Sequence, residues 1–97
     1  MIILKDYYEL LKNRDIPTEE AAEMRREALN RYEQKLLAQG WQLSIGEGGL
    51  VSPDNSAVLY LFRSPYHGQL FPLSQDGEKS FELIKSEFIK SGDFIEV

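Results

Sequence analysis

The sequence predicts an α+β fold with two N-terminal helices, a small antiparallel β-sheet of about three to four strands, and a C-terminal helix. Three observations support this class. Apolar residues recur at helical spacing before Gly40, alternate with polar residues after it, and return to helical spacing near the end of the chain. The 97 residues contain no repeat and no long linker, so we expect a single domain over 1–97.

The first 40 residues predict two helices. The first is expected from about Ile3 to Asn13, where apolar residues are spaced by three and four, and DIP at 15–17 then interrupts it. The second is expected to take Thr18 as its N-cap and to stop at Gly40, with acidic residues in its first turn. Its expected core face consists of Ala21, Met24, Ala28, Leu29, Tyr32 and Leu36.

The segment after the second helix predicts three strands. Period-two alternation indicates a first strand whose buried face consists of Trp41, Leu43 and Ile45. GEGG at 46–49 and PDNS at 53–56 are turn sequences, and LVS lies between them. The run AVLYLFR at 57–63 is apolar on both faces, so we expect it inside the sheet, with helix cover on one side.

The remaining chain predicts a loop, a helix and a short strand. SPYHGQLFP at 64–72 is expected as a loop, with a short edge strand at 69–73 because its second proline tolerates only an edge or a strand end. Helical spacing returns from about 77 to 91, with Asp76 as the N-cap and Gly92 as the stop. The closing FIEV is expected as a last strand.

Composition narrows the function classes. The net charge is −5, and between Trp41 and Gln75 the only basic residue is Arg63, so we do not expect binding to nucleic acid. There is no cysteine for a disulfide, a thiolate metal site or a thiol nucleophile. The sequence shows neither a secretory signal nor a membrane-spanning apolar run, and we expect no membrane partner and a cytoplasmic location.

Part of the N-terminal half resembles a known family. KDYYELL at 5–11, TEEA at 18–21 and the basic, alanine-containing helix that follows are similar to the first two helices of J-domain co-chaperones. That family acts on its ATPase partner through a His-Pro-Asp tripeptide after the second helix. Here Glu33, Gln34 and Lys35 stand near that place, and strands are expected to follow. No functional residue is therefore transferred from the resemblance.

His67 is the one histidine of the chain and lies in the 64–72 loop. As a general base it would need a nearby hydroxyl, from Tyr66 or Ser64, and a carboxylate from elsewhere to orient it. No sequence motif surrounds it, and the alternative is a loop residue at a contact surface.

Arg25 lies within the apolar arc of the second helix, where an unpaired guanidinium would be costly to bury. Three arrangements would avoid this cost. The stem of Arg25 could pack at the edge of the core with its charge in water, the guanidinium could pair with a buried carboxylate, or the side chain could face a groove where a partner docks. The helix also carries glutamates spaced by four, which suit a solvated face better than a metal site.

We therefore expect a small acidic protein-interaction or regulatory domain without catalytic residues, metal or cofactor. Aromatic residues gather in the strand-forming half, and an apolar sheet face without helix cover is typical of a partner surface. The partner is expected to be a protein or a second copy, bound through Arg25, Arg63, Tyr66, His67 and Phe71. The alternatives are an acid–base enzyme centred on His67 and an acidic antagonist of the immunity or inhibitor type.

Overall fold

The computed structural model describes residues 1–74 and 77–97 and confirms the α+β class, with three helices and one antiparallel sheet. The expected N-cap Asp76 lies outside the described residues. The elements in chain order are β1 (Ile2–Leu4), α1 (Lys5–Lys12), α2 (Thr18–Ala38), β2 (Gln42–Ser44), β3 (Gly49–Val51), β4 (Ala57–Tyr60), β5 (Gln69–Pro72), α3 (Glu78–Lys90) and β6 (Phe94–Glu96).

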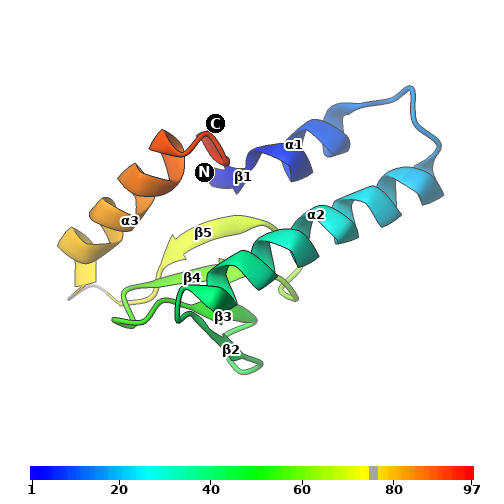
Figure 1. Cartoon of the computed structure of the whole chain (residues 1–97). Coiled ribbons are helices and arrows are strands. Elements are labelled where there is room, and N and C mark those ends of the chain that lie inside the picture. Colours follow the sequence, from blue (N-terminus) through cyan, green and yellow to red (C-terminus); the bar gives the residue numbers. More distant parts are fainter. Residues whose placement is uncertain (75–76) are drawn as a thin grey trace.

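The sheet has six strands in the order β2-β3-β4-β5-β1-β6, and every neighbouring pair is antiparallel. The expectation of three to four strands is too low, because β1 was not expected as a strand and the short segments expected at 69–73 and at the closing FIEV both join the sheet. β1 lies between β5 and β6, which brings the two termini together (Figure 1). There the Met1 amino group donates to the Val97 carbonyl at 2.6 Å, and the Val97 N–H donates to the Met1 carbonyl at 2.9 Å.

Two strand assignments need correction. Residues Ile2–Leu4 were expected in part as the start of the first helix, but they form β1 because β5 and β6 supply hydrogen-bond ladders on both of its sides. The expected edge strand at 69–73 is β5, an interior strand between β4 and β1. Pro72 is tolerated there because it is the last residue of the strand, opposite Ala57.

The helices occupy the expected segments, with one change of cap. Pro17 rather than Thr18 occupies the N-cap position of α2, and its carbonyl accepts the first helical hydrogen bond, from Ala21 N–H at 2.9 Å. Gly40 and Gly92 follow α2 and α3 with φ of 96° and 82°, so both expected glycine stops are confirmed. Among the described residues, no helix has the apolar length needed to cross a membrane.

One face of the sheet forms the core with all three helices. Leu50, Leu59, Leu70 and Ile2 lie opposite one another across four strands. The side chains that pack against this face come from every helix and from β6, and they include Tyr7, Ala28, Tyr32, Leu36, Phe81, Phe88 and Phe94. Of the expected core residues of α2, Met24 is instead 38% exposed, although Ala21 one turn before it is buried.

The strand expected after Gly40 is β2, and its burial was predicted wrongly. Trp41 is buried, but Leu43 is 49% and Ile45 84% exposed. Alternation correctly indicates that Leu43 lies on the helix side, since it is opposite Leu50. β2 is nevertheless the outermost strand of the sheet, where cover is incomplete.

Candidate functional site

The opposite face of the sheet carries a cluster of aromatic rings that we call the aromatic surface, formed by Tyr60, Tyr66 and Phe71 with Arg63. The ring centroids lie 5.9 Å apart for Tyr60 and Tyr66, 5.3 Å for Tyr60 and Phe71, and 5.4 Å for Tyr66 and Phe71. Each of the three rings therefore contacts the other two. Tyr66 remains 41% exposed, so the cluster is open to solvent.

The strand register places two of these rings on the face away from the helices. Phe71 is opposite Val58, which lies opposite Val51, and this row alternates with the core row of Leu50, Leu59 and Leu70. Tyr60 follows Val58 by two residues and so shares its face. Val58 is only 1% exposed although its row faces away from the helices. The aromatic surface therefore borders buried apolar residues.

The loop between β4 and β5 brings Tyr66 to the two strand residues. Tyr66 N–H donates to the Arg63 carbonyl at 2.7 Å, and Gln69 N–H donates to the Tyr66 carbonyl at 3.0 Å. These bonds close the turn that returns the chain into β5.

Gly68 fixes the end of this loop to the sheet. Its N–H donates to the Tyr60 carbonyl and its carbonyl accepts from Leu4 N–H, both at 2.8 Å, so the residue bridges β4 and β1. Its φ is 78°, and a Cβ there would lie 3.4 Å from the Tyr7 ring. The positive φ is what favours glycine here, since a Cβ at 3.4 Å would make an ordinary van der Waals contact.

Arg63 extends the aromatic surface with a positive charge. Its guanidinium carbon lies 5.6 Å from the centroid of the Tyr60 ring, within the range of a cation–π contact. The residue is exposed, and its Cβ packs close to Gly48 of the β2–β3 turn. The structure thus brings together Arg63, Tyr66 and Phe71, three of the residues that the sequence singled out.

His67 is half-buried between Tyr66 and Gly68. Within residues 1–74 and 77–97, no hydrogen bond or ion pair involves its ring. The described part of the chain therefore offers no carboxylate that orients His67 in the way a general base requires.

Arg25 lies apart from the aromatic surface. It is half-buried on α2, and its guanidinium carbon is 6.0 Å from the centroid of the Tyr7 ring on α1. No ion pair of Arg25 occurs among the described residues. Of the three alternatives for this residue, packing of the side chain at the edge of the core fits these contacts.

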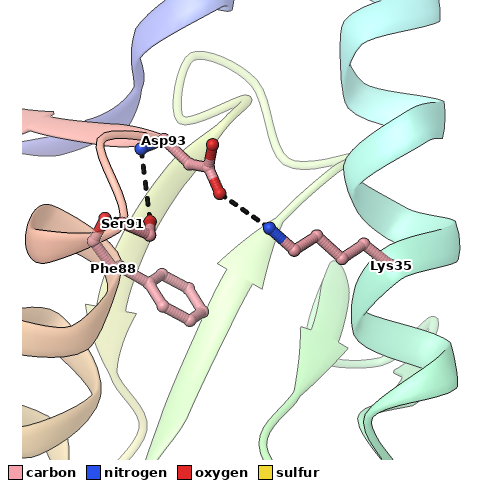
Figure 2. A network of polar contacts seen from close by, with 4 residues as sticks. All are labelled: Lys35, Phe88, Ser91 and Asp93. Atoms are coloured by element: carbon pink, nitrogen blue, oxygen red, sulfur yellow. Dashed lines mark hydrogen bonds and ion pairs between the residues drawn. The ribbon is translucent and has the colours of Figure 1, made fainter.

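A polar cluster that the sequence did not indicate joins α2 to the turn before β6. Lys35 Nζ pairs with Asp93 Oδ2 at 2.8 Å, and Asp93 N–H donates to Ser91 Oγ at 3.2 Å (Figure 2). The Lys35 ammonium lowers the pKa of Asp93. Burial, together with the nearby Asp93 carboxylate, raises the pKa of Tyr32 well above its ordinary value. A cavity of about 220 Å³ lies beside these groups, and its lining includes both signs of charge.

The PDNS segment forms the expected turn between β3 and β4, closed by a serine–carboxylate network. Ser52 Oγ and Ser56 Oγ donate to Asp54 Oδ1 at 2.8 and 2.6 Å, and Asn55 adopts the left-handed conformation with φ 60°. The hydrogen bond from Ser56, then that from Ser52, lowers the pKa of Asp54. The network satisfies its own polar groups, so it stabilises the turn.

No group of three or more histidine, aspartate or glutamate side chains suited to a metal ion occurs in the described part of the chain. Comparison with models of known protein families gave no match, and neither a curated protein nor a solved structure showed significant similarity.

Proposed function

We propose that this protein is a non-catalytic interaction module of the cytoplasm that binds a protein partner through the aromatic surface. The observation that carries this proposal is the mutual contact of Tyr60, Tyr66 and Phe71 on the sheet face that the helices leave uncovered, with Arg63 beside them. Tyrosine and arginine are enriched among residues that dominate binding energy at protein interfaces.

The chemistry of the aromatic surface indicates which kind of protein segment would bind there. Three rings held at centroid distances of 5.3–5.9 Å form a preorganised apolar platform, so little side-chain entropy is lost on binding. Arg63 presents its guanidinium at the edge of that platform. A protein segment with an apolar side chain beside a carboxylate fits both features, because the ring cluster takes the first and Arg63 pairs with the second.

Site-specific photocrosslinking tests the proposal. A photoreactive phenylalanine analogue at Tyr66 is expected to capture a defined partner in the native host, whereas the same analogue at Leu83, an exposed residue of α3, is not. With the purified partner, Tyr66→Ala and Arg63→Ala should each weaken affinity by about tenfold or more. Leu83→Ala should leave affinity unchanged.

Two results would contradict the proposal. One is equal capture of the same proteins from Tyr66 and Leu83. The other is a purified partner that binds Tyr66→Ala and Arg63→Ala as tightly as it binds the unchanged protein.

A further inference from the structure

The outer edge of β2 offers backbone hydrogen-bonding groups. β2 is the first strand in the sheet order, so no strand of the described residues lies beyond it. The Ser44 carbonyl accepts from Gly48 N–H at 3.0 Å within its own hairpin, so the backbone groups of Ser44 point inward. Successive residues of a strand point in opposite directions, and the N–H and C=O of Leu43 therefore point to the open edge.

The two edges of the sheet differ in their protection against another strand. β6 carries Glu96, which pairs with Lys85 of α3 at 3.0 Å, and charges of this kind discourage edge-to-edge pairing. β2 carries no charge and no proline, and its Leu43 and the following Ile45 are 49% and 84% exposed. The β2 edge is thus open and uncharged, and its exposed leucine is apolar.

We propose that β2 pairs antiparallel with β2 of a second copy of this chain, about a twofold axis at Leu43. The pairing joins two six-stranded sheets into one continuous sheet. In this register Leu43 faces its own counterpart, Gln42 faces Ser44, and Trp41 faces Ile45.

The register is self-complementary in chemistry. The pair of Leu43 with Leu43 falls on the helix side of the sheet and is apolar, while the pair of Gln42 with Ser44 falls on the other side and is polar. The seven residues from Gly40 to Gly46 contain no charge. Two chains of net charge −5 can therefore approach along this edge without placing like charges opposite each other.

The surroundings of β2 leave room for the second copy. In Figure 1 the β2–β3 hairpin lies at the lower end of the sheet, away from α1 and α3.

The proposed dimer does not use the aromatic surface, but it places the aromatic surfaces of the two copies on the same side of the joined sheet. A twofold axis perpendicular to the sheet keeps each face on its own side, so both copies present their aromatic surfaces on the same side of the joined sheet. A partner with two binding segments would then gain affinity from the higher effective concentration of the second segment.

Sedimentation velocity between about 10 µM and about 1 mM tests the pairing, because a contact along one short strand predicts a weak dimer. The unchanged protein should pass from monomer to dimer mass across that range. Leu43→Lys and Ile45→Lys should each raise the dissociation constant by about tenfold or more, since Leu43→Lys sets two ammonium groups opposite each other. The matched control is Leu83→Lys, which replaces a 68% exposed leucine on α3 and should leave the dimer unchanged.

Several outcomes would overturn the pairing. They are a monomer at every concentration, a dimer that survives both β2 substitutions, and a dimer that Tyr66→Ala abolishes, which would place the contact in the aromatic surface. If Leu43→Lys disturbs folding, Ile45→Lys carries the test, because Ile45 is the more exposed residue. A dimer that persists in Tyr66→Ala shows that dimerisation does not need the aromatic surface, so it can be judged separately from partner binding.

Discussion

At the scale of residues, close backbone approach decides which side chain β3 can accept beside the aromatic surface. Gly49 lies opposite Tyr60, and a Cβ at Gly49 would overlap the carbonyl group of Leu59. The preceding Gly48 carbonyl accepts hydrogen bonds from both Leu61 and Phe62, at 3.0 and 2.9 Å. The end of β4 is thus drawn against the β2–β3 turn so closely that a side chain at position 49 has no room.

Gly49→Ala should therefore destabilise the protein by about 3 kcal/mol, in the range of severe overpacking. Gly46→Ala is the matched control, because a Cβ at Gly46 meets no atom within 4 Å. Both substitutions restrict the unfolded chain in the same way, so their difference isolates the native contact. Urea unfolding measures both free energies, and equal stability of the two variants would refute the overlap.

The residues of the candidate site were partly predictable. Arg63, Tyr66 and Phe71 were selected from the sequence and do lie together, since β4, β5 and their loop are consecutive in the chain. His67, from the same loop, enters none of the ring contacts, and Arg25 packs on Tyr7. Helical spacing places Arg25 on an inner arc, but it cannot indicate which neighbour that arc meets. Binding by these residues stays a prediction.

At the scale of elements, the Lys35–Asp93 pair ties α2 to the turn that precedes β6. Asp93 follows Gly92, and its carbonyl accepts from Lys5 N–H at 2.8 Å, so the same turn also holds the start of α1. Two helices and one strand thus meet at this turn. Both side chains of the ion pair are partly exposed, so we expect its contribution to be below about 1 kcal/mol.

Asp93 of this ion pair and the neighbouring Tyr32 should make the stability of the folded protein depend on pH. The pKa of Asp93 is lower in the folded state, so its stabilisation is present above the unfolded pKa, 3.8, and is lost as the pH falls through the folded value. The pKa of Tyr32 is raised, so its contribution is present below the unfolded value, 10.0, and declines as the pH rises above it. Maximum stability is expected between these limits.

The substitution Asp93→Asn tests the expected loss of stability at low pH. The unchanged protein should be more stable than this variant at about pH 7, and the difference should shrink as the pH falls toward about 3. Denaturant unfolding across this range measures it. Lys35→Met should reproduce the loss at about pH 7, whereas a difference that stays constant with pH would show that the Asp93 charge contributes nothing.

The long helices were predicted from the sequence more accurately than the short strands. α2 and α3 were predicted nearly to their bounds, since helical periodicity is a local signal that repeats over many residues. β1 was missed because three residues show no period, and its ladder partners lie at the far end of the chain. Alternation in β2 indicated the correct side for Leu43 but could not show that this side is uncovered at the edge of the sheet.

At the scale of the whole molecule, Phe94 holds three elements together. It is 1% exposed, and its ring centroid lies 5.1 Å from that of Tyr32 on α2 and 4.8 Å from that of Phe88 on α3. Phe88 also stacks on Trp41 at 5.6 Å. One cluster of contacting aromatic rings therefore connects β6, both long helices and the start of the β2 region.

Phe94→Ala should cost about 4 kcal/mol, the usual range for a phenylalanine removed from a core. A domain of this size is stable by roughly 5–15 kcal/mol, so the variant should unfold at much lower denaturant concentration. Phe62→Ala, at a phenylalanine that is 54% exposed, is the matched control and should change stability little. Similar unfolding midpoints for the two variants would contradict the role of Phe94.

The overall class was predictable, but the arrangement of the strands was not. Separate helical and alternating segments indicate α+β, and this class is confirmed. The strand order depends on which segments meet in space, and no local pattern in the sequence encodes the insertion of β1 between β5 and β6.

That insertion has a consequence for synthesis. Among the strands of the sheet β1 is translated first, yet the two strands that flank it are β5 and β6, and β6 is translated last. The α1–α2 hairpin can form early because its contacts are local. Ile2–Leu4 must wait for β5 to pair on one side, and the other side stays unpaired until residues 94–96 have left the ribosome. A nascent chain stalled before Phe94 keeps three apolar residues without a complete ladder and is a natural client for chaperones.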